Sequence, residues 1–162
     1  MSTRSGIGYD SHRLVEGRRL ILGGVEIAAD RGLDGHSDAD VLSHAVIDAL
    51  LGAAGLGDIG QHFPDSDERY RDADSLVLLS EALASVRAAG FELVHVDATV
   101  VMERPKLGTA RQAIRDGLAE VLGLAATNVN IKATTGEGIG FVGRGEGVVA
   151  LAIATLAQRA GG

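Results

Sequence analysis

The sequence predicts one α/β (α+β) domain, with a mixed β-sheet and helices packed on one face of it. Its length of 162 residues suits a single domain. Segments of alternating hydrophobicity are interspersed with segments whose apolar residues recur at helical spacing. The chain has only two prolines and no linker-like tract, so we expect residues 1–162 to form one domain.

Each expected element follows from its local pattern. In chain order we expect strands over 4–14 and 19–27, helices over 39–54 and 75–89, a strand over 91–103, a helix over 107–122, and strands over 129–134 and 147–157. The second strand is interrupted at Gly23-Gly24, which indicates a turn or bulge. Residues that favour helix ends flank the helices: Asp38 or Ser37 and then Asp74 as N-caps, and Gly55, Gly90 and Gly123 after the last turns.

The C-terminal half predicts parallel pairing. Alternation over 91–103 places one set of apolar residues on one face: Val94, Val96, Ala98, Val100 and Met102. The helix over 107–122 carries Ile114, Leu118 and Val121 at helical spacing. A strand, a helix and a strand in succession form a crossover that makes the two strands parallel. The apolar run 147–157 fits a strand or a helix, and its Val-Val start after a Gly-rich turn favours a strand.

Composition argues against several functions. Aromatic residues make up only 3%, too few for a protein that stacks single-stranded bases. A net charge of −7 argues against nucleic acid or an anionic membrane as partner. The lack of Cys excludes disulfides, thiolate metal sites and Cys nucleophiles. The start of the chain lacks a signal-peptide pattern, and we expect a cytoplasmic location.

Asp10 and His12 predict half of a metal site, because alternate residues of a strand point to the same side. The helix over 39–54 adds a stripe of Asp40, His44 and Asp48, spaced four residues apart. Two His and one Asp with an open fourth position suit a catalytic Zn²⁺. From spacing alone, the solvated face of an amphipathic helix is the better explanation of the stripe.

Three loops could bind substrate. The segment Gly35–Asp40 precedes a helix, so its N–H groups could hold an anion beside His36, although a capped helix start with an exposed His36 explains it too. The Asp-rich loop 57–67 could bind hydroxyls or a hard cation, or merely form turns. A G-x-G-x-x-G begins at Gly138, but no βαβ unit follows it, so we reject a dinucleotide site. Amides of this loop can still approach a phosphate.

Taken together, these segments resemble the family of 2-C-methyl-D-erythritol 2,4-cyclodiphosphate synthases of non-mevalonate isoprenoid biosynthesis. The matching motifs run from residue 8 to 147 in the family's order: Gly8-Tyr9-Asp10-Ser11-His12, Gly35-His36-Ser37-Asp38-Ala39-Asp40 with His44, Asp58-Ile59-Gly60 through Phe63-Pro64-Asp65-Ser66-Asp67, Arg104-Pro105-Lys106, and Lys132-Ala133-Thr134-Thr135 through Gly140-Phe141-Val142-Gly143-Arg144-Gly145-Glu146-Gly147. Each motif alone is weak, and their combination is specific.

The resemblance implies roles for individual residues. Asp10, His12 and His44 would be ligands of a divalent metal, usually Zn²⁺. His36 and Thr135 would be catalytic, and Glu137 would bind a second cation, Mg²⁺ or Mn²⁺, on the substrate phosphates. The implied substrate contacts are Asp10, His12, His36, Ser37, Asp58, Ile59, Gly60, Phe63, Pro64, Asp65, Ser66, Asp67, Met102, Glu103, Arg104, Pro105, Lys106, Leu107, Gly108, Thr134, Thr135, Gly136, Glu137, Phe141 and Arg144.

The implied enzyme is a phosphorus–oxygen lyase. It would convert 4-diphosphocytidyl-2-C-methyl-D-erythritol 2-phosphate to the 2,4-cyclodiphosphate and CMP. The resemblance also implies a homotrimer with active sites between subunits, in which an isoprenoid diphosphate can lie on the three-fold axis near Arg144 and Glu146. The chain departs from the family at Gly136 and Gly138, where Thr and Lys are usual. A non-catalytic binder of metal or isoprenoid diphosphate, and a hydrolase using the same metal, are the competing interpretations.

Overall fold

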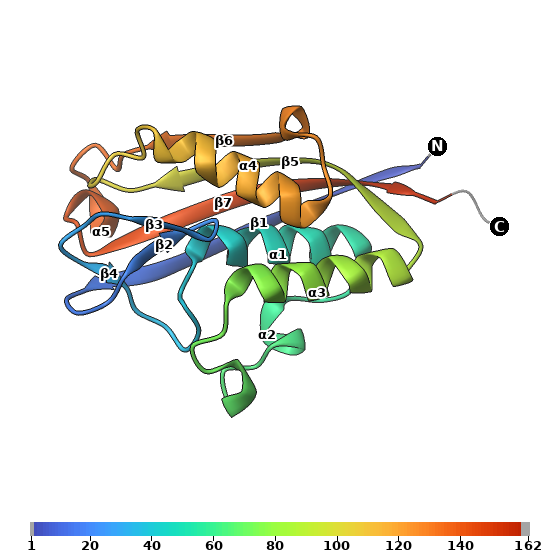
Figure 1. Cartoon of the computed structure of the whole chain (residues 1–162), viewed down its shortest axis with the longest axis horizontal. Coiled ribbons are helices and arrows are strands. Elements are labelled where there is room, and N and C mark those ends of the chain that lie inside the picture. The colour runs from blue at the N-terminus through green and yellow to red at the C-terminus, as the bar shows by residue number, and fades with distance from the viewer. Residues whose placement is uncertain (1, 160–162) are drawn as a thin grey trace.

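The protein folds as a five-stranded mixed sheet with its three long helices on one side, as Figure 1 shows. The computed structural model describes residues 2–159. The strands are β1 (Thr3–Val15), β2 (Leu20–Leu22), β3 (Val25–Ile27), β4 (Gly32–Leu33), β5 (Phe91–Val101), β6 (Val129–Thr134) and β7 (Gly147–Gln158). The helices are α1 (Val41–Ala54), α2 (Ile59–His62), α3 (Ser75–Ala88), α4 (Ala110–Leu122) and α5 (Gly140–Gly143), with 3₁₀ turns η1 (Glu68–Tyr70) and η2 (Ala126–Asn128).

The sheet has the order β4-β1-β7-β5-β6, and β2 and β3 form a separate hairpin. β5 and β6 pair in parallel and are joined through α4, which confirms the predicted crossover. All other pairs in the large sheet are antiparallel. The run 147–157 is a strand as predicted, and it occupies the centre of the sheet between β1 and β5. The predicted fold class is therefore confirmed.

α1 lies unusually close to β1, because two glycines of the strand face it. A Cβ at Gly8 would come within 1.8 Å of the Ala45 carbonyl oxygen, and one at Gly6 within 2.2 Å of that of Ala49. Only glycine is compatible with this backbone-to-backbone approach. The close contact places His44, the neighbour of Ala45, beside the strand that carries Asp10 and His12.

Two predicted helix starts are wrong. The N-cap of α1 is Asp40, not Asp38 or Ser37, and its carboxylate accepts a hydrogen bond from the Ser43 N–H (3.0 Å). The helix cannot start before Asp40, because Ala39 has a positive φ of 57°, which a right-handed helix excludes. The Asp38 carboxylate bonds Ser75 on α3 as well as the Asp40 N–H. α4 begins at Ala110 and not at 107, because the chain first makes a turn closed by the Ala110 N–H and the Leu107 carbonyl (2.9 Å).

The predicted apolar face of β5 is wrong at its beginning. A register shift between Leu93 and His95 inserts one extra residue against β7. Because a bulge reverses the alternation, Phe91 and Leu93 join Val96 in the core, while Val94 is 42% exposed. Beyond the bulge, Ala98 and Val100 are buried as predicted, and the buried Met102 follows the strand. Val121 of α4 is only partly buried, unlike Ile114 and Leu118.

The sheet face opposite the helices carries exposed apolar side chains. Ile7 pairs with Ile153, and Tyr9 pairs with Leu151 across the β1–β7 ladder. These four side chains, which we call the open-face cluster, are between 37% and 69% exposed. Apolar side chains grouped in this way are typical of an interaction surface. Among residues 2–159, no helix is long and apolar enough to cross a membrane.

Candidate active site

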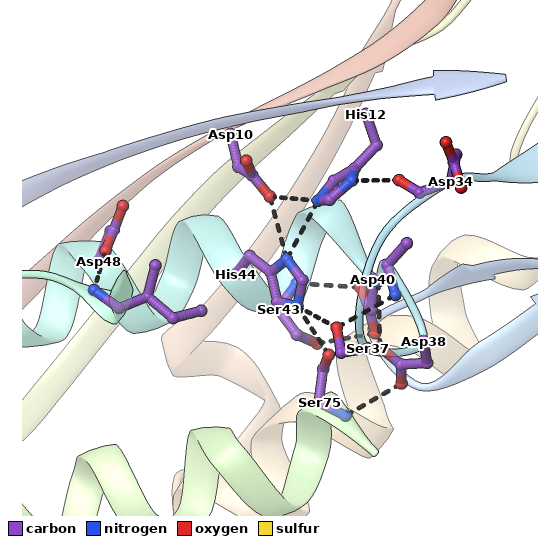
Figure 2. A network of polar contacts seen from close by, with 12 residues as sticks. Asp10, His12, Asp34, Ser37, Asp38, Asp40, Ser43, His44, Asp48 and Ser75 are labelled. Carbon is purple, nitrogen blue, oxygen red and sulfur yellow. Dashed lines mark hydrogen bonds and ion pairs between the residues drawn. The ribbon is translucent and has the colours of Figure 1, made fainter. Parts of the chain in front are cut away.

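Asp10, His12 and His44 bring three metal-ligand atoms together at the junction of β1 and α1 (Figure 2). Asp10 Oδ2 lies 2.9 Å from His12 Nε2 and 3.1 Å from His44 Nδ1, and the two ring nitrogens are 3.2 Å apart. Ligands of a tetrahedral Zn²⁺ are about 3.3 Å from one another, given bonds of about 2.0–2.1 Å. The triangle therefore fits a divalent metal without rearrangement of the side chains.

The charges of this cluster also suit a cation. Burial alone would raise the pKa of Asp10, but hydrogen bonds with His12 and His44 lower it to about 2. Burial likewise disfavours the charged form of His12, yet Asp10 and the Asp34 carbonyl raise the pKa of this imidazole. His12 Nδ1 lies 2.6 Å from the Asp34 carbonyl oxygen and donates to it, so in neutral His12 the Nε2 lone pair faces the cluster. An ionised carboxylate thus faces two imidazoles.

Only one residue of the helical stripe belongs to the cluster. Asp40 is completely buried and accepts four hydrogen bonds, from the amides of Gly23, Gly24 and Ser43 and from the Ser43 hydroxyl. Asp48 accepts from the Ile59 N–H (2.8 Å) at the start of α2. Both carboxylates therefore join α1 to neighbouring segments. The spacing predicted that they would be metal ligands or part of a solvated face, and both predictions are wrong for these two residues.

Three of the six amides in the segment Gly35–Asp40 bond within the chain. The Ala39 N–H donates to Ser37 Oγ (3.3 Å), and the Asp40 N–H donates to Asp38 Oδ1 (3.1 Å). The Asp38 N–H donates to the Ala73 carbonyl. These three donors belong to the capped start of the helix and are not free to hold an anion. His36 is half-buried, with its Nε2 3.2 Å from the Asp67 carbonyl oxygen.

A cavity of about 300 Å³ opens above the three ligands. Several predicted substrate contacts line it together with the cluster: His36, Ser37, Ile59, Gly60, Phe63, Pro64 and Asp65. Asp58 and Asp67 instead cap short helices, accepting from the Gln61 and Arg69 N–H groups. Tyr70 and Leu78 also line the cavity and were not predicted. Tyr70 packs edge-on against Phe63, with ring centroids 5.4 Å apart.

A second cavity, of about 370 Å³, lies between the end of β6 and the turn before α4. It gathers predicted substrate contacts from both segments: Met102, Pro105, Lys106, Leu107, Gly108, Thr134 and Thr135. Val100, Arg111 and Ala133 complete it without having been predicted. The two cavities share no lining residue, so they are separate hollows of the single chain.

Comparisons with known proteins agree with this geometry. Residues 3–157 match the model of the YgbB family. The chain belongs to the YgbB family. It is 57% identical over 159 residues to a 2-C-methyl-D-erythritol 2,4-cyclodiphosphate synthase from Laribacter hongkongensis, covering 98% of each chain. The predicted family is thereby confirmed, together with the enzyme class that its members are named for.

Solved structures of family members have the same fold. One is a 2C-methyl-D-erythritol-2,4-cyclodiphosphate synthase in a CDP-bound form, which matches with a TM-score of 0.88 at 42% identity, over 95% of this chain and all of that one (100%). Another is the bifunctional IspDF of Campylobacter jejuni, with a TM-score of 0.94 at 44% identity over 97% of this chain. The chain spans 42% of that bifunctional protein.

The glycine at position 136, where the resemblance leads us to expect Thr, has a local explanation. The Gly136 N–H donates to Glu103 Oε1 (2.6 Å), and a Cβ at this position would lie 2.8 Å from the Gly143 nitrogen. Gly143 in turn is packed against Gly138, whose φ of 72° favours glycine. The loop is therefore packed tightly against itself, and the Glu103 carboxylate accepts a hydrogen bond from its backbone. Exposed Glu137 follows it, with its N–H bonded to Thr135 Oγ (3.1 Å).

Proposed function

We propose that the chain converts 4-diphosphocytidyl-2-C-methyl-D-erythritol 2-phosphate to 2-C-methyl-D-erythritol 2,4-cyclodiphosphate and CMP. The convergence of Asp10, His12 and His44 at the base of a cavity is the observation that carries the proposal. In this reaction the 2-phosphate oxygen bonds to the β-phosphorus, and the bond from that phosphorus to the bridging oxygen breaks. CMP leaves with this oxygen and its electron pair.

The three ligands would hold a Zn²⁺, since two imidazoles and one carboxylate with an open fourth position suit this ion. When bound, such an ion neutralises phosphate charge and polarises phosphoryl oxygens. Glu137, which is exposed, would bind a second cation, Mg²⁺ or Mn²⁺, together with the phosphates. The main barrier is to align two anionic groups of one molecule, so the task of the protein is positioning and charge compensation.

Other residues would hold the remaining parts of the substrate. His36, at the wall of the metal cavity, would orient the transferring phosphate, and Ser37 and Asp65 would contact the hydroxyls of the ribose and the methylerythritol. Lys106 and Thr134, in the second cavity, would hold the cytidine and its phosphate. The CDP bound by a related synthase supports a cytidine nucleotide as one half of the substrate.

Product analysis by ³¹P NMR tests the proposed reaction directly. Incubation of the metal-loaded protein with the substrate should yield a cyclic diphosphate and CMP in equal amounts. A linear phosphate product together with CMP would identify the protein as a hydrolase instead, because water rather than the 2-phosphate would have attacked. Substrate bound but unchanged would favour the non-catalytic binder.

We further propose a homotrimer in which each active site joins the metal cavity of one subunit to the nucleotide cavity of the next. Two observations support this arrangement: the cavities are separate within one chain, and the open-face cluster offers an apolar surface for subunit contact. An isoprenoid diphosphate on the three-fold axis would meet Arg144, which pairs with Glu146 in the single chain (2.9 Å). Residues 1–162 form one domain in this proposal.

Mixed trimers of two inactive variants should regain activity. His44→Ala damages only the metal half of each site, and Lys106→Ala only the nucleotide half. In any ring that contains both variants, one boundary joins an intact metal half to an intact nucleotide half. Each mixed ring should therefore recover about one third of wild-type activity. Co-refolding the two variants and assaying the mixture checks this.

Mixing the two folded variants without subunit exchange is the control, and it should restore nothing. Mass spectrometry must show that the refolded sample contains hetero-trimers. If such a sample is as inactive as the parent proteins, each site lies within one subunit and the proposed arrangement is wrong.

Thr135→Val should lower kcat about 100-fold, as loss of a donor to a transition-state oxygen does in other enzymes. CMP affinity should change little, because the Thr135 hydroxyl would stabilise the phosphates only in the transition state and not in the bound nucleotide. Thr135→Ser keeps the hydroxyl that bonds the Glu137 N–H and should retain most of the activity. Steady-state kinetics with CMP binding measured in parallel checks this, and an unchanged kcat in Thr135→Val would assign the residue a purely structural role.

A further inference from the structure

Ser75, the first residue of α3, lies behind His44, on the side of the imidazole that faces away from the metal cluster (Figure 2). His44 Nε2 is 2.8 Å from Ser75 Oγ and 3.2 Å from Ser37 Oγ. All three side chains are buried. A hydroxyl can donate to an imidazole nitrogen or accept from it, so these contacts alone do not determine which nitrogen of His44 carries the proton.

Asp38 removes this ambiguity. The Ser75 hydroxyl donates to Asp38 Oδ1 in a short hydrogen bond, and the Ser75 N–H donates to Oδ2 (2.9 Å). The Asp40 N–H also donates to Oδ1 (3.1 Å) and holds the carboxylate in place. A serine hydroxyl has one proton, and here Asp38 receives it. Ser75 Oγ can then only accept from His44, so Nε2 carries a proton, and Nδ1 is the nitrogen left to bind a metal beside Asp10 and His12.

We propose that Ser75 and Asp38 are a positioning pair that sets the tautomer of His44 and thereby the affinity of the protein for its metal. This inference rests on the proposed metal site. His12 needs no such pair, because the Asp34 carbonyl can only accept and fixes its tautomer directly. For His44, the direction of the hydrogen bond at Nε2 depends on two side chains, Ser75 and Asp38, and Ser75 lies on α3. A change at the start of α3 should therefore alter the metal site.

Two substitutions test the pair through zinc affinity, measured by competition with a chromogenic chelator. Ser75→Ala removes the acceptor of the His44 proton. Asp38→Ala leaves the Ser75 hydroxyl in place but frees its proton, which can then be donated to His44 Nε2 and favour the unproductive tautomer. Each should weaken zinc binding about 10- to 100-fold, the range typical for partners of metal-ligating histidines.

Ser43→Ala is the matched control. Ser43 is a completely buried serine next to His44 in sequence, but its hydroxyl donates to Asp40 and not to the imidazole. Its removal should lower the stability of the protein while leaving zinc affinity within about threefold of wild type, because no partner of a ligand is lost. A loss of zinc affinity in Ser43→Ala as large as that in Ser75→Ala would overturn the proposal, since any buried serine would then have the same effect.

The proton on Nε2 can be detected through the ¹⁵N shifts of the His44 ring in the metal-free protein. Wild type should show a protonated Nε2, and Asp38→Ala should show a population in which Nε2 is bare and Nδ1 is protonated. A wild-type protein with a bare Nε2, or the same state of Nε2 in both proteins, would overturn the inference. A merely structural role for Asp38 would not move these shifts.

His44→Ala separates this inference from the proposed metal site. If His44→Ala binds zinc as wild type does, the metal site itself is wrong. If it loses zinc while Ser75→Ala and Asp38→Ala keep wild-type affinity, the metal site stands and the positioning pair is wrong. Weaker binding in Ser75→Ala alone would overturn the part assigned to Asp38.

Discussion

His44→Ala should lose bound zinc and nearly all cyclisation while remaining folded. The substitution removes one of three ligand atoms, and the remaining two do not complete a tetrahedral site. The polar contacts of His44 are with the other ligands and with Ser37 and Ser75, not with the apolar core. The substitution should therefore leave the apolar packing around α1 intact. Metal analysis of the purified protein, circular dichroism and an assay of CMP release check the three parts of this expectation.

His62→Ala is a suitable control for the metal analysis. Its imidazole lies outside the cluster and bonds the Leu56 carbonyl (2.8 Å). This variant should retain its full zinc complement. A full zinc complement with normal turnover in His44→Ala would refute the assignment of the ligands.

Gly8→Ala should destabilise the protein by about 3 kcal/mol, at the upper end of the usual cost of overpacking. The added methyl would meet the carbonyl oxygen of Ala45 at 1.8 Å and its carbon at 2.7 Å, and a helix backbone cannot rotate away as a side chain can. α1 must therefore move as a unit, which carries His44 away from Asp10 and weakens zinc binding. Chemical denaturation and the chelator assay measure the two effects.

Gly52→Ala provides the matched comparison for Gly8→Ala. Gly52 lies on the exposed side of α1, and a Cβ there would meet nothing within 4 Å. Because alanine restricts the unfolded chain and favours a helix, this variant should be more stable by about 0.5–1 kcal/mol. Equal stability of Gly8→Ala and wild type would show that α1 does not rest on β1 as closely as the structure has it.

Local patterns predicted the elements well where one periodicity extends through a whole segment. Strand β6 and its parallel pairing with β5 follow from the sequence without correction. The errors occur where a special backbone conformation or a long-range contact decides. Asp40 rather than Asp38 caps α1 because Ala39, between them, has a positive φ that no helix residue adopts. The bulge at Val94 is also set by pairing with β7, which periodicity within β5 cannot show.

The candidate site was predictable only in part for the same reason. Asp10 and His12 converge because they alternate on one strand, and spacing alone indicates this. By spacing alone His44 was one of three residues in a stripe; the family resemblance singles it out, and the close packing of α1 on β1 gives the physical reason. Ser75 and Tyr70 belong to segments without a motif, and no signal in the sequence connects them to the cluster.

The layer between α1 and the sheet restricts how this sequence can diverge. Gly6 and Gly8 on β1 face Ala45 and Ala49 on α1, and backbone atoms there are in near contact. A core made of large flexible side chains can absorb a mutation by changing rotamers, and a second mutation elsewhere can compensate for it. Where backbone meets backbone, no rotamer can change. Neutral drift should therefore be confined here to the smallest residues, while the Leu-rich contacts of α3 and α4 remain free to exchange one aliphatic side chain for another.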